Sequence, residues 1–158
     1  MSNGNVIYNK ALAEMSKNDP DIEKVHLLLE KSSKKGNPSA TYALGTWYLH
    51  GEHVTKNISK ALKLLRTAAK NNEPNALYDM AVCYETGEGV KKNLRLAMEF
   101  YMRASLYGDK QSIYEVGRCY YYGIGINKNR RLAWIWLDRA KGLGIDEDIE
   151  RTKAQRNS

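Results

Sequence analysis

The sequence predicts an all-α fold, a solenoid of about four helix pairs along 158 residues. One pattern recurs three times at a spacing of 36 residues, beginning with the small residues Gly45, Ala81 and Gly117. Within each copy, apolar residues recur at helical spacing. A period of this length is typical of a solenoid, in which each unit buries its apolar face only against its neighbours. Three further sets of residues keep the register: Tyr48, Tyr84 and Tyr120; Gly51, Gly87 and Gly123; Ala61, Ala97 and Ala133.

The first element is a degenerate copy of the pattern over residues 5–38. Val25 and Leu29 lie 36 residues before their counterparts, while residues 18–21 replace the glycine loop and make it about three residues shorter. Terminal repeats are commonly atypical because they cap the stack. We therefore expect this segment to form an N-terminal repeat.

The copy at residues 39–74 shows how one unit is built. Small and apolar residues from Ala40 to Tyr48 predict a first helix that ends at Gly51. A short loop follows, and Asn57 is a good N-cap for the second helix. The same cap position holds Asn93 and Asn129 in the later copies.

The later copies, residues 75–110 and 111–144, carry a second glycine in the loop. We expect Gly89 and Gly125 to adopt a positive φ angle, which glycine tolerates without strain. His53 stands at that place in the earlier copy. That loop is therefore predicted to be the most strained or to bend differently.

The C-terminal segment, residues 145–158, is predicted to cap the last unit. Asp146 can begin a short polar helix that runs to about Gln155. With this cap, residues 1–158 are expected to form a single solenoid domain.

The composition favours a water-soluble protein with a basic surface. The net charge of +7 and the pI near 9.3 make an acidic partner more favourable than a basic one, although a solvated basic face is the alternative interpretation. No stretch approaches the roughly 18 apolar residues of a membrane span. Because residues 1–5 are polar and no long apolar run follows, we expect a cytoplasmic location. Cys83 and Cys119 are expected to be reduced thiols.

The residue types that recur in each copy follow the order found in a known repeat. The string Ala-x3-Leu-Gly-x2-Tyr-x2-Gly-x2-Val from Ala40 to Val54, followed by Ala61, resembles the Sel1-like repeat, a family related to the tetratricopeptide repeats. The resemblance covers about residues 39–144. It implies a right-handed superhelix of antiparallel helix pairs that binds another protein as an adaptor, scaffold or inhibitor.

Positions that change between the copies are the candidates for a binding surface. In tetratricopeptide-like stacks the first helices line the concave groove, so we expect a partner protein to bind there. The alternative is that these positions are exposed and neutral. By register Tyr120 is expected in the core, which leaves its two neighbours available for contact. Tyr42 is a candidate for another reason: it recurs as Tyr78 and Tyr114 at the edge of the changing positions, and tyrosine is enriched at binding hot spots. The candidate residues are Tyr42, Thr46, His50, Asp79, Val82, Thr86, Gln111, Glu115, Arg118, Tyr121 and Tyr122.

The sequence contains no pattern that indicates a catalytic, cofactor or metal site. His50, Glu52 and His53 offer too few metal ligands, and neither cysteine has a histidine at helical spacing. We therefore predict a protein that is not an enzyme and binds no cofactor.

Two uses of a protein-binding solenoid stay open. One is a scaffold or adaptor, and the other is a dedicated inhibitor such as a bacterial immunity protein that neutralises a toxin. The remote alternative is a helical-repeat nucleic-acid binder, which is disfavoured because Asp79 and Glu115 would repel phosphate.

Overall fold

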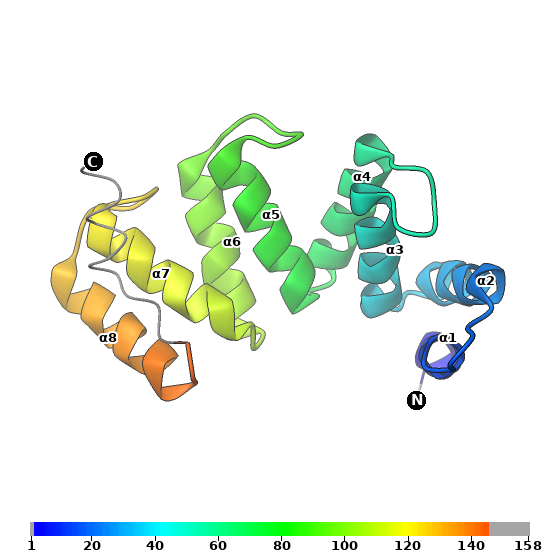
Figure 1. Ribbon diagram of the computed structural model, residues 1–158. Helices are drawn as coiled ribbons and strands as arrows, with labels where there is room; N and C mark the ends of the chain where they lie inside the picture. The colour runs from blue at the N-terminus through cyan, green and yellow to red at the C-terminus, as the bar shows by residue number, and fades with distance from the viewer. Residues whose placement is uncertain (1, 146–158) are drawn as a thin grey trace. The chain divides into compact units, whose positions relative to one another are not determined.

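The computed structural model describes residues 2–145 (Figure 1). Within this range the chain forms eight α-helices of 13 residues each and no β-strand. The predicted all-α solenoid of helix pairs is therefore confirmed, while the predicted helix from Asp146 lies outside the described residues. The helices are α1 (Asn3–Met15), α2 (Ile22–Lys34), α3 (Pro38–His50), α4 (Ile58–Lys70), α5 (Pro74–Thr86), α6 (Leu94–Leu106), α7 (Lys110–Tyr122) and α8 (Arg130–Gly142).

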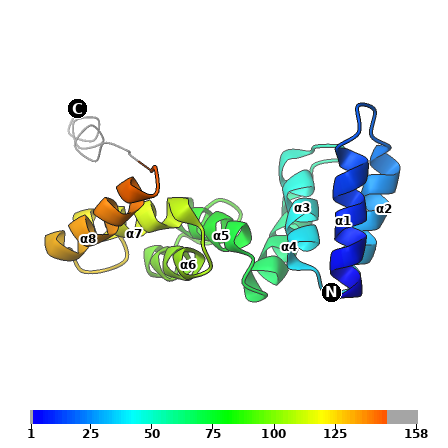
Figure 2. The ribbon, with the colours of Figure 1, turned by 90° about the horizontal axis from the view of Figure 1, so that it is seen from below.

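The chain divides into two compact units, Met1–Met80 and Ala81–Ser158, with the boundary inside α5. In the N-terminal unit, α1 packs against α2, α3 packs against α4, and α2 also contacts α3. Figure 2 shows α1 and α2 lying side by side. In the C-terminal unit, α7 packs against α8 and also contacts α6. Consecutive helices therefore bury their apolar faces on each other within each unit.

Small residues allow the paired helices to approach closely. A Cβ atom added to Gly45 of α3 would lie 3.0 Å from Leu65 of α4. The equivalent addition to Gly117 of α7 would lie 2.8 Å from Leu137 of α8. The second helices contribute alanines with no exposed surface, namely Ala61, Ala97 and Ala133. Larger side chains at these positions would push the helices apart.

Asparagine caps begin α4, α6 and α8, as predicted. The Asn57 side chain accepts a hydrogen bond from the Lys60 backbone N–H at 3.0 Å. Its own backbone N–H donates to the carbonyl of Tyr48 at 2.8 Å, which closes the loop. The same two bonds recur at Asn93 and Asn129. One residue thus satisfies an orphan helix amide and fixes the loop that precedes it.

The left-handed position in the loops also recurs. Gly89 and Gly125 have φ angles of 69° and 67°, which confirms the predicted positive φ. His53 has a φ angle of 59°, so its loop keeps the same conformation and places a side chain in a strained region instead of bending differently. The His53 ring packs on the ring of Trp47, with centroids 4.8 Å apart.

The N-terminal repeat deviates less than predicted. Residues 16–21 connect α1 to α2 and residues 51–57 connect α3 to α4, so the first connection is one residue shorter and not three. Polar contacts tie α1 to α2 and to Asn37, the residue that caps the start of α3. Ser32 donates to the carbonyl of Gly4 at 2.7 Å, and the Asn37 amide donates to Asn5 at 2.7 Å.

Candidate protein-binding surfaces

The predicted residues of α3 lie at different depths. Tyr42 and Thr46 are half-buried, and His50 at the end of the helix is exposed. The Thr46 hydroxyl donates to the carbonyl of Ala43 at 2.8 Å, so it is already satisfied within the helix. His50 is therefore the most accessible of the three to a partner.

The predicted residues of α5 follow the same trend. Asp79 and Val82 are half-buried, whereas Thr86 is exposed in the last turn. The Thr86 hydroxyl donates to the carbonyl of Val82 at 2.9 Å and accepts from the backbone N–H of Glu88 at 3.3 Å. These bonds hold the end of the helix and the start of its loop.

The predicted residues of α7 are largely buried, which corrects part of the sequence interpretation. Glu115 and Arg118 are each 9% exposed and Tyr121 is 3% exposed, while Gln111 and Tyr122 are half-buried. The change of residue type between the copies was interpreted as a sign of exposure. In the third copy it instead reflects a polar network that is internal to the C-terminal unit.

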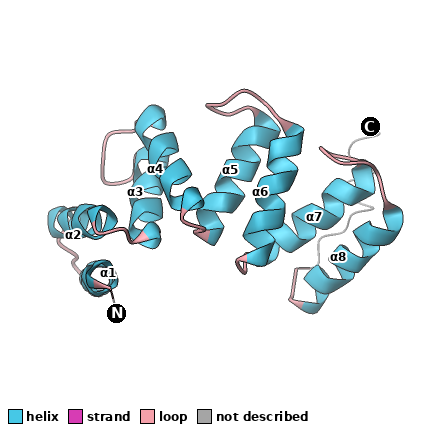
Figure 3. Cartoon of the chain, turned by 180° about the vertical axis from the view of Figure 1, so that it is seen from behind, coloured by secondary structure: helices cyan, strands magenta, loops and turns pink. Residues whose placement is uncertain are grey.

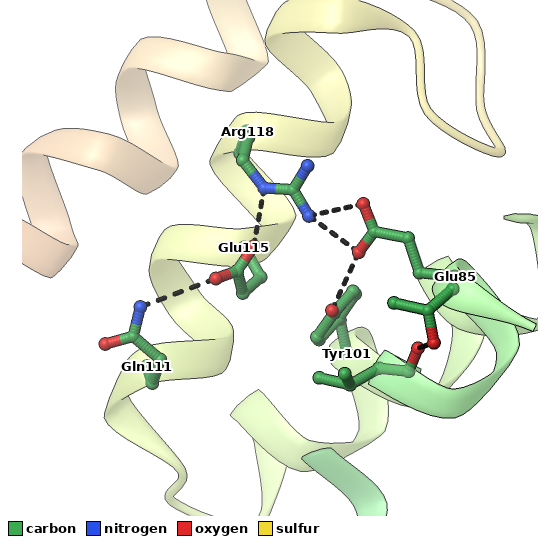
Figure 4. Close-up of polar contacts among 7 residues, drawn as sticks. Glu85, Tyr101, Gln111, Glu115 and Arg118 are labelled. Atoms are coloured by element: carbon green, nitrogen blue, oxygen red, sulfur yellow. Dashed lines mark hydrogen bonds and ion pairs between the residues drawn. The ribbon is translucent and has the colours of Figure 1, made fainter. Parts of the chain in front are cut away.

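Arg118 lies at the centre of this network (Figure 4). Its Nε donates to Glu115 at 2.6 Å, and its Nη2 donates to the two carboxylate oxygens of Glu85 at 2.8 and 2.7 Å. The Tyr101 hydroxyl donates to the same Glu85 carboxylate at 2.8 Å. Gln111 extends the network with a bond to Glu115 at 3.4 Å. Helices α5, α6 and α7 are therefore connected by one set of charged hydrogen bonds.

The electrostatics of the network keep Arg118 charged and Tyr101 neutral. Burial disfavours the charged guanidinium of Arg118, but the carboxylates of Glu115 and Glu85 outweigh burial and raise its pKa. Burial and the negative charge of Glu85 raise the pKa of Tyr101, which therefore stays a neutral donor. Burial also raises the pKa of the neighbouring Cys119 thiol to about 12, so this cysteine is an inert packing residue.

Tyr120 and Tyr121 near the end of α7 both pack in the C-terminal unit, and Tyr121 is the more deeply buried of the two. Tyr120, expected in the core, is half-buried, and Tyr121, expected at the surface, is buried. The reason is the contacts of the Tyr121 ring. The Arg130 guanidinium stacks over it at 3.8 Å, and Trp134 packs edge-on with centroids 5.9 Å apart. These contacts with α8 could not be predicted from the position of Tyr121 within the repeat.

An open groove of about 450 Å³ lies in the C-terminal unit between α6 and the loop that precedes α8 (the loop is pink in Figure 3). We call it the C-terminal loop groove. Its apolar side chains come from both elements, and three charged side chains line it as well. The lining residues are Arg95, Met98, Glu99, Met102, Arg103, Gly125 and Ile126.

A second open pocket, of about 330 Å³, occupies the equivalent place in the N-terminal unit. We call it the N-terminal loop pocket. It lies between α2 and the loop that precedes α4, and it is lined by Ile22, Glu23, His26, Leu27, His53 and Val54. Five of these positions lie 72 residues before lining residues of the C-terminal loop groove, so the two hollows share one register of the repeat.

The two hollows differ in how closely the loop approaches the helix. A Cβ atom at Gly125 would overlap the backbone carbonyl of Leu94 at the start of α6. The equivalent loop carries His53, whose side chain packs on Trp47. The glycine thus lets the third loop lie directly on α6. Sequence reasoning missed both hollows, although the loop glycines and the charges on the second helices were visible in it.

Two further observations concern the described residues as a whole. No group of three or more histidine, cysteine, aspartate or glutamate side chains within residues 2–145 is arranged to hold a metal ion. None of the helices in this same part of the chain is long and apolar enough to cross a membrane.

Comparison with known proteins identifies the repeat. The family model of the Sel1 repeat matches residues 38–73, 74–109 and 110–145. No curated protein matches the chain. Among solved structures, a Sel1 repeat protein from Oxalobacter formigenes aligns with a TM-score of 0.81 and 27% identity over 89% of this chain and 58% of its own.

Two further structures share the fold at lower identity. A protective antigen of uropathogenic Escherichia coli that displays an SLR fold has a TM-score of 0.81 and 22% identity over 90% of this chain and 31% of its own. An immunity protein from Pseudomonas aeruginosa has a TM-score of 0.62 and 23% identity over 89% of this chain and 53% of its own. The chain thus spans little more than half, or less, of these three proteins. With three matched repeats over most of its length, the chain belongs to the Sel1-repeat family, whose members are protein-interaction modules.

Proposed function

We propose that this chain binds a partner protein through the first helices of its repeats and acts as a scaffold or adaptor. The observation that carries the proposal is the division between constant and changing positions. Constant positions such as Ala61, Ala97 and Ala133 are fully buried, and the capping asparagines recur with the same hydrogen bonds. Exposed first-helix positions change from His50 to Thr86 to the half-buried Tyr122. Each repeat thus combines constant buried positions with surface side chains that differ from copy to copy.

Three of the predicted residues are buried in the C-terminal unit, so they are left out of the proposed contact surface. Glu115 and Arg118 bind each other, and Tyr121 is covered by Arg130, so their proposed role is to hold α7 in place. The proposed contacts are the remaining predicted residues, which we call the first-helix residues: Tyr42, Thr46, His50, Asp79, Val82, Thr86, Gln111 and Tyr122. Tyrosine supplies a large contact area and a polar tip, a combination that is enriched at binding hot spots. The cytoplasmic location predicted from the sequence is part of this proposal.

An affinity purification from the native host tests the proposal. The wild-type protein is compared with a Thr86→Arg, Tyr122→Ala double variant and with Arg66→Glu as a matched control on α4. Thr86 and Arg66 are both exposed, whereas Tyr122 is half-buried and packs on the ring of Tyr121. Circular dichroism therefore checks that the double variant keeps the helix content of the wild type. We expect a stoichiometric partner with the wild type and with Arg66→Glu, and its loss with the double variant. Equal recovery with all three proteins would place the binding surface elsewhere.

A second candidate function is a dedicated inhibitor of a toxin. What supports it is the similarity of fold to the Pseudomonas aeruginosa immunity protein. The test is co-expression with a toxin gene that lies beside the gene for this chain. Rescue of growth by the wild type, and not by the Thr86→Arg, Tyr122→Ala variant, would support an inhibitor; failure of the wild type to rescue growth would exclude that toxin as the target.

A further inference from the structure

We propose that the C-terminal loop groove is a second docking surface, which takes an acidic segment of a partner protein that carries one apolar anchor residue. The proposal rests on the protein-binding function above and adds a surface on α6 and the loop before α8. No residue of this groove belongs to the first-helix residues. The two surfaces can therefore be tested separately.

The floor of the groove fits an apolar side chain. Met98, Met102 and Ile126 line it, and Gly125 brings the loop close enough to α6 to form one wall. Methionine side chains are flexible and polarisable, so they adapt to apolar groups of different shape. The volume of about 450 Å³ is large enough for one aromatic or branched aliphatic side chain.

The rim of the groove is basic. The Arg95 side chain is 84% exposed, and its Nε lies 3.4 Å from a carboxylate oxygen of Glu99. The Arg103 guanidinium lies over the ring of Phe100 at 5.6 Å. The groove therefore carries two arginines against one glutamate. Exposed lysines at positions 91, 92 and 128 flank the two elements that form it. Positive potential of this kind attracts carboxylates and raises the rate of encounter.

The N-terminal loop pocket is a natural control for the role of charge. Glu23 stands at the position of Arg95, Leu27 at the position of Glu99, and His53 at the position of Gly125. The pocket at the equivalent place in the N-terminal repeat is therefore lined without arginine. An acidic segment is expected in the C-terminal loop groove alone.

A peptide fits the C-terminal loop groove better than nucleic acid does. A phosphate backbone carries no apolar side chain and gains nothing from the methionine floor. A peptide with carboxylates around one apolar residue satisfies the floor and the rim together. Nucleic acid is retained as an outcome of the test.

Methyl NMR gives a direct readout, because two of the five methionines line the groove. The probe is a set of four hexapeptides with two acidic residues on each side of a central pair that contains leucine, methionine, phenylalanine or tryptophan. We expect at least one peptide to shift the methyl signals of Met98 and Met102. The signal of Met15 on α1 serves as the internal control and should not move.

Two matched variants separate specific docking from general charge attraction. Arg95→Glu should weaken peptide binding roughly tenfold, because it removes one exposed ion pair and adds a repulsion of similar size. Glu23→Arg, at the equivalent position of the other hollow, should leave the Met98 and Met102 shifts unchanged. Met102→Ala should weaken binding without changing its dependence on salt.

The proposal is overturned if none of the four peptides moves the Met98 and Met102 signals at 1 mM, or if lysine-flanked peptides move them equally. A mixed-sequence DNA 12-mer that shifts these signals more strongly than the peptides would also overturn it in favour of nucleic acid. Loss of partner recovery with the Thr86→Arg, Tyr122→Ala variant, together with unmoved methionine signals, would support the first-helix surface and reject the groove. Unchanged partner recovery with the double variant, together with shifted Met98 and Met102 signals, would support the groove and reject the first-helix surface.

Discussion

Arg118 of α7 forms an ion pair with Glu85 of α5, which lies 33 residues earlier in the sequence. The Nη2 atom of Arg118 is 2.7 Å from the nearer carboxylate oxygen of Glu85. The side chains are only 11% and 21% exposed. Water therefore screens the pair weakly, and each partner depends on the other for hydrogen bonds. The pair connects the second and third matched repeats within one unit.

Removing one partner of this pair should destabilise the protein strongly. We expect Arg118→Ala to lower the free energy of unfolding by about 3 kcal/mol, because it leaves the Glu85 and Glu115 carboxylates partly buried without their shared cation. The exposed pair of Arg95 and Glu99 is the control, and Arg95→Ala should cost less than about 0.5 kcal/mol. Urea unfolding followed by circular dichroism measures both. Equal costs for the two variants would show that the network does not stabilise the fold.

Removal of a buried hydroxyl in α7 should stabilise the protein. The side-chain oxygen of Ser112 is fully buried and has no hydrogen-bond partner among the described residues. The equivalent positions in the other copies hold Ala40 and Ala76, which are also fully buried. We expect Ser112→Ala to raise the free energy of unfolding by about 1 kcal/mol. A lower thermal midpoint for the variant would mean that this hydroxyl is satisfied in solution.

Two substitutions at His53 measure the cost of a side chain at this positive φ angle. Both His53→Gly and His53→Ala remove the ring contact with Trp47, but only alanine keeps a Cβ atom at a φ angle of 59°. We expect the glycine variant to be more stable than the alanine variant by about 1 kcal/mol. Thermal unfolding of the two proteins gives the difference. If alanine were the more stable, the loop would have to adopt another conformation.

Acid should weaken the contact between α1 and α2. Hydrogen bonds from Lys17 and Lys24 lower the pKa of Glu14 to about 2 from its ordinary value of 4.5. A lowered pKa in the folded state means that the carboxylate stabilises the protein above pH 4.5 and that this contribution is lost as the pH falls towards 2. The thermal midpoint of the wild type should therefore fall more steeply over this range than that of Glu14→Gln. Parallel curves would show that Glu14 has no such role.

Local and periodic features of the structure were predictable from the sequence. The 36-residue spacing predicted the helix pairs, and the asparagines predicted the helix starts. The glycines of the loops predicted the positive φ angle that His53 also adopts. These features depend on a few neighbouring residues, so their physical causes are visible in one copy of the repeat.

The candidate surfaces were less predictable, because they depend on contacts between distant residues. The spacing of Glu115 and Arg118 suits an ion pair along a helix, but Glu85 and Tyr101 reach it only through the fold. Likewise, nothing near Tyr121 in the sequence indicates that Arg130 covers its ring. A comparison of copies detects which positions change, and only the structure shows which of those are accessible.

Photocrosslinking in the native host tests the central claim, that the first helices contact a partner protein. A photoreactive amino acid is placed at His50, Thr86 or Tyr122, and at Arg66 on α4 as the control position. We expect a covalent adduct with one protein at one or more of the first three positions and none at position 66. Adducts at position 66 alone, or at no position, would contradict it.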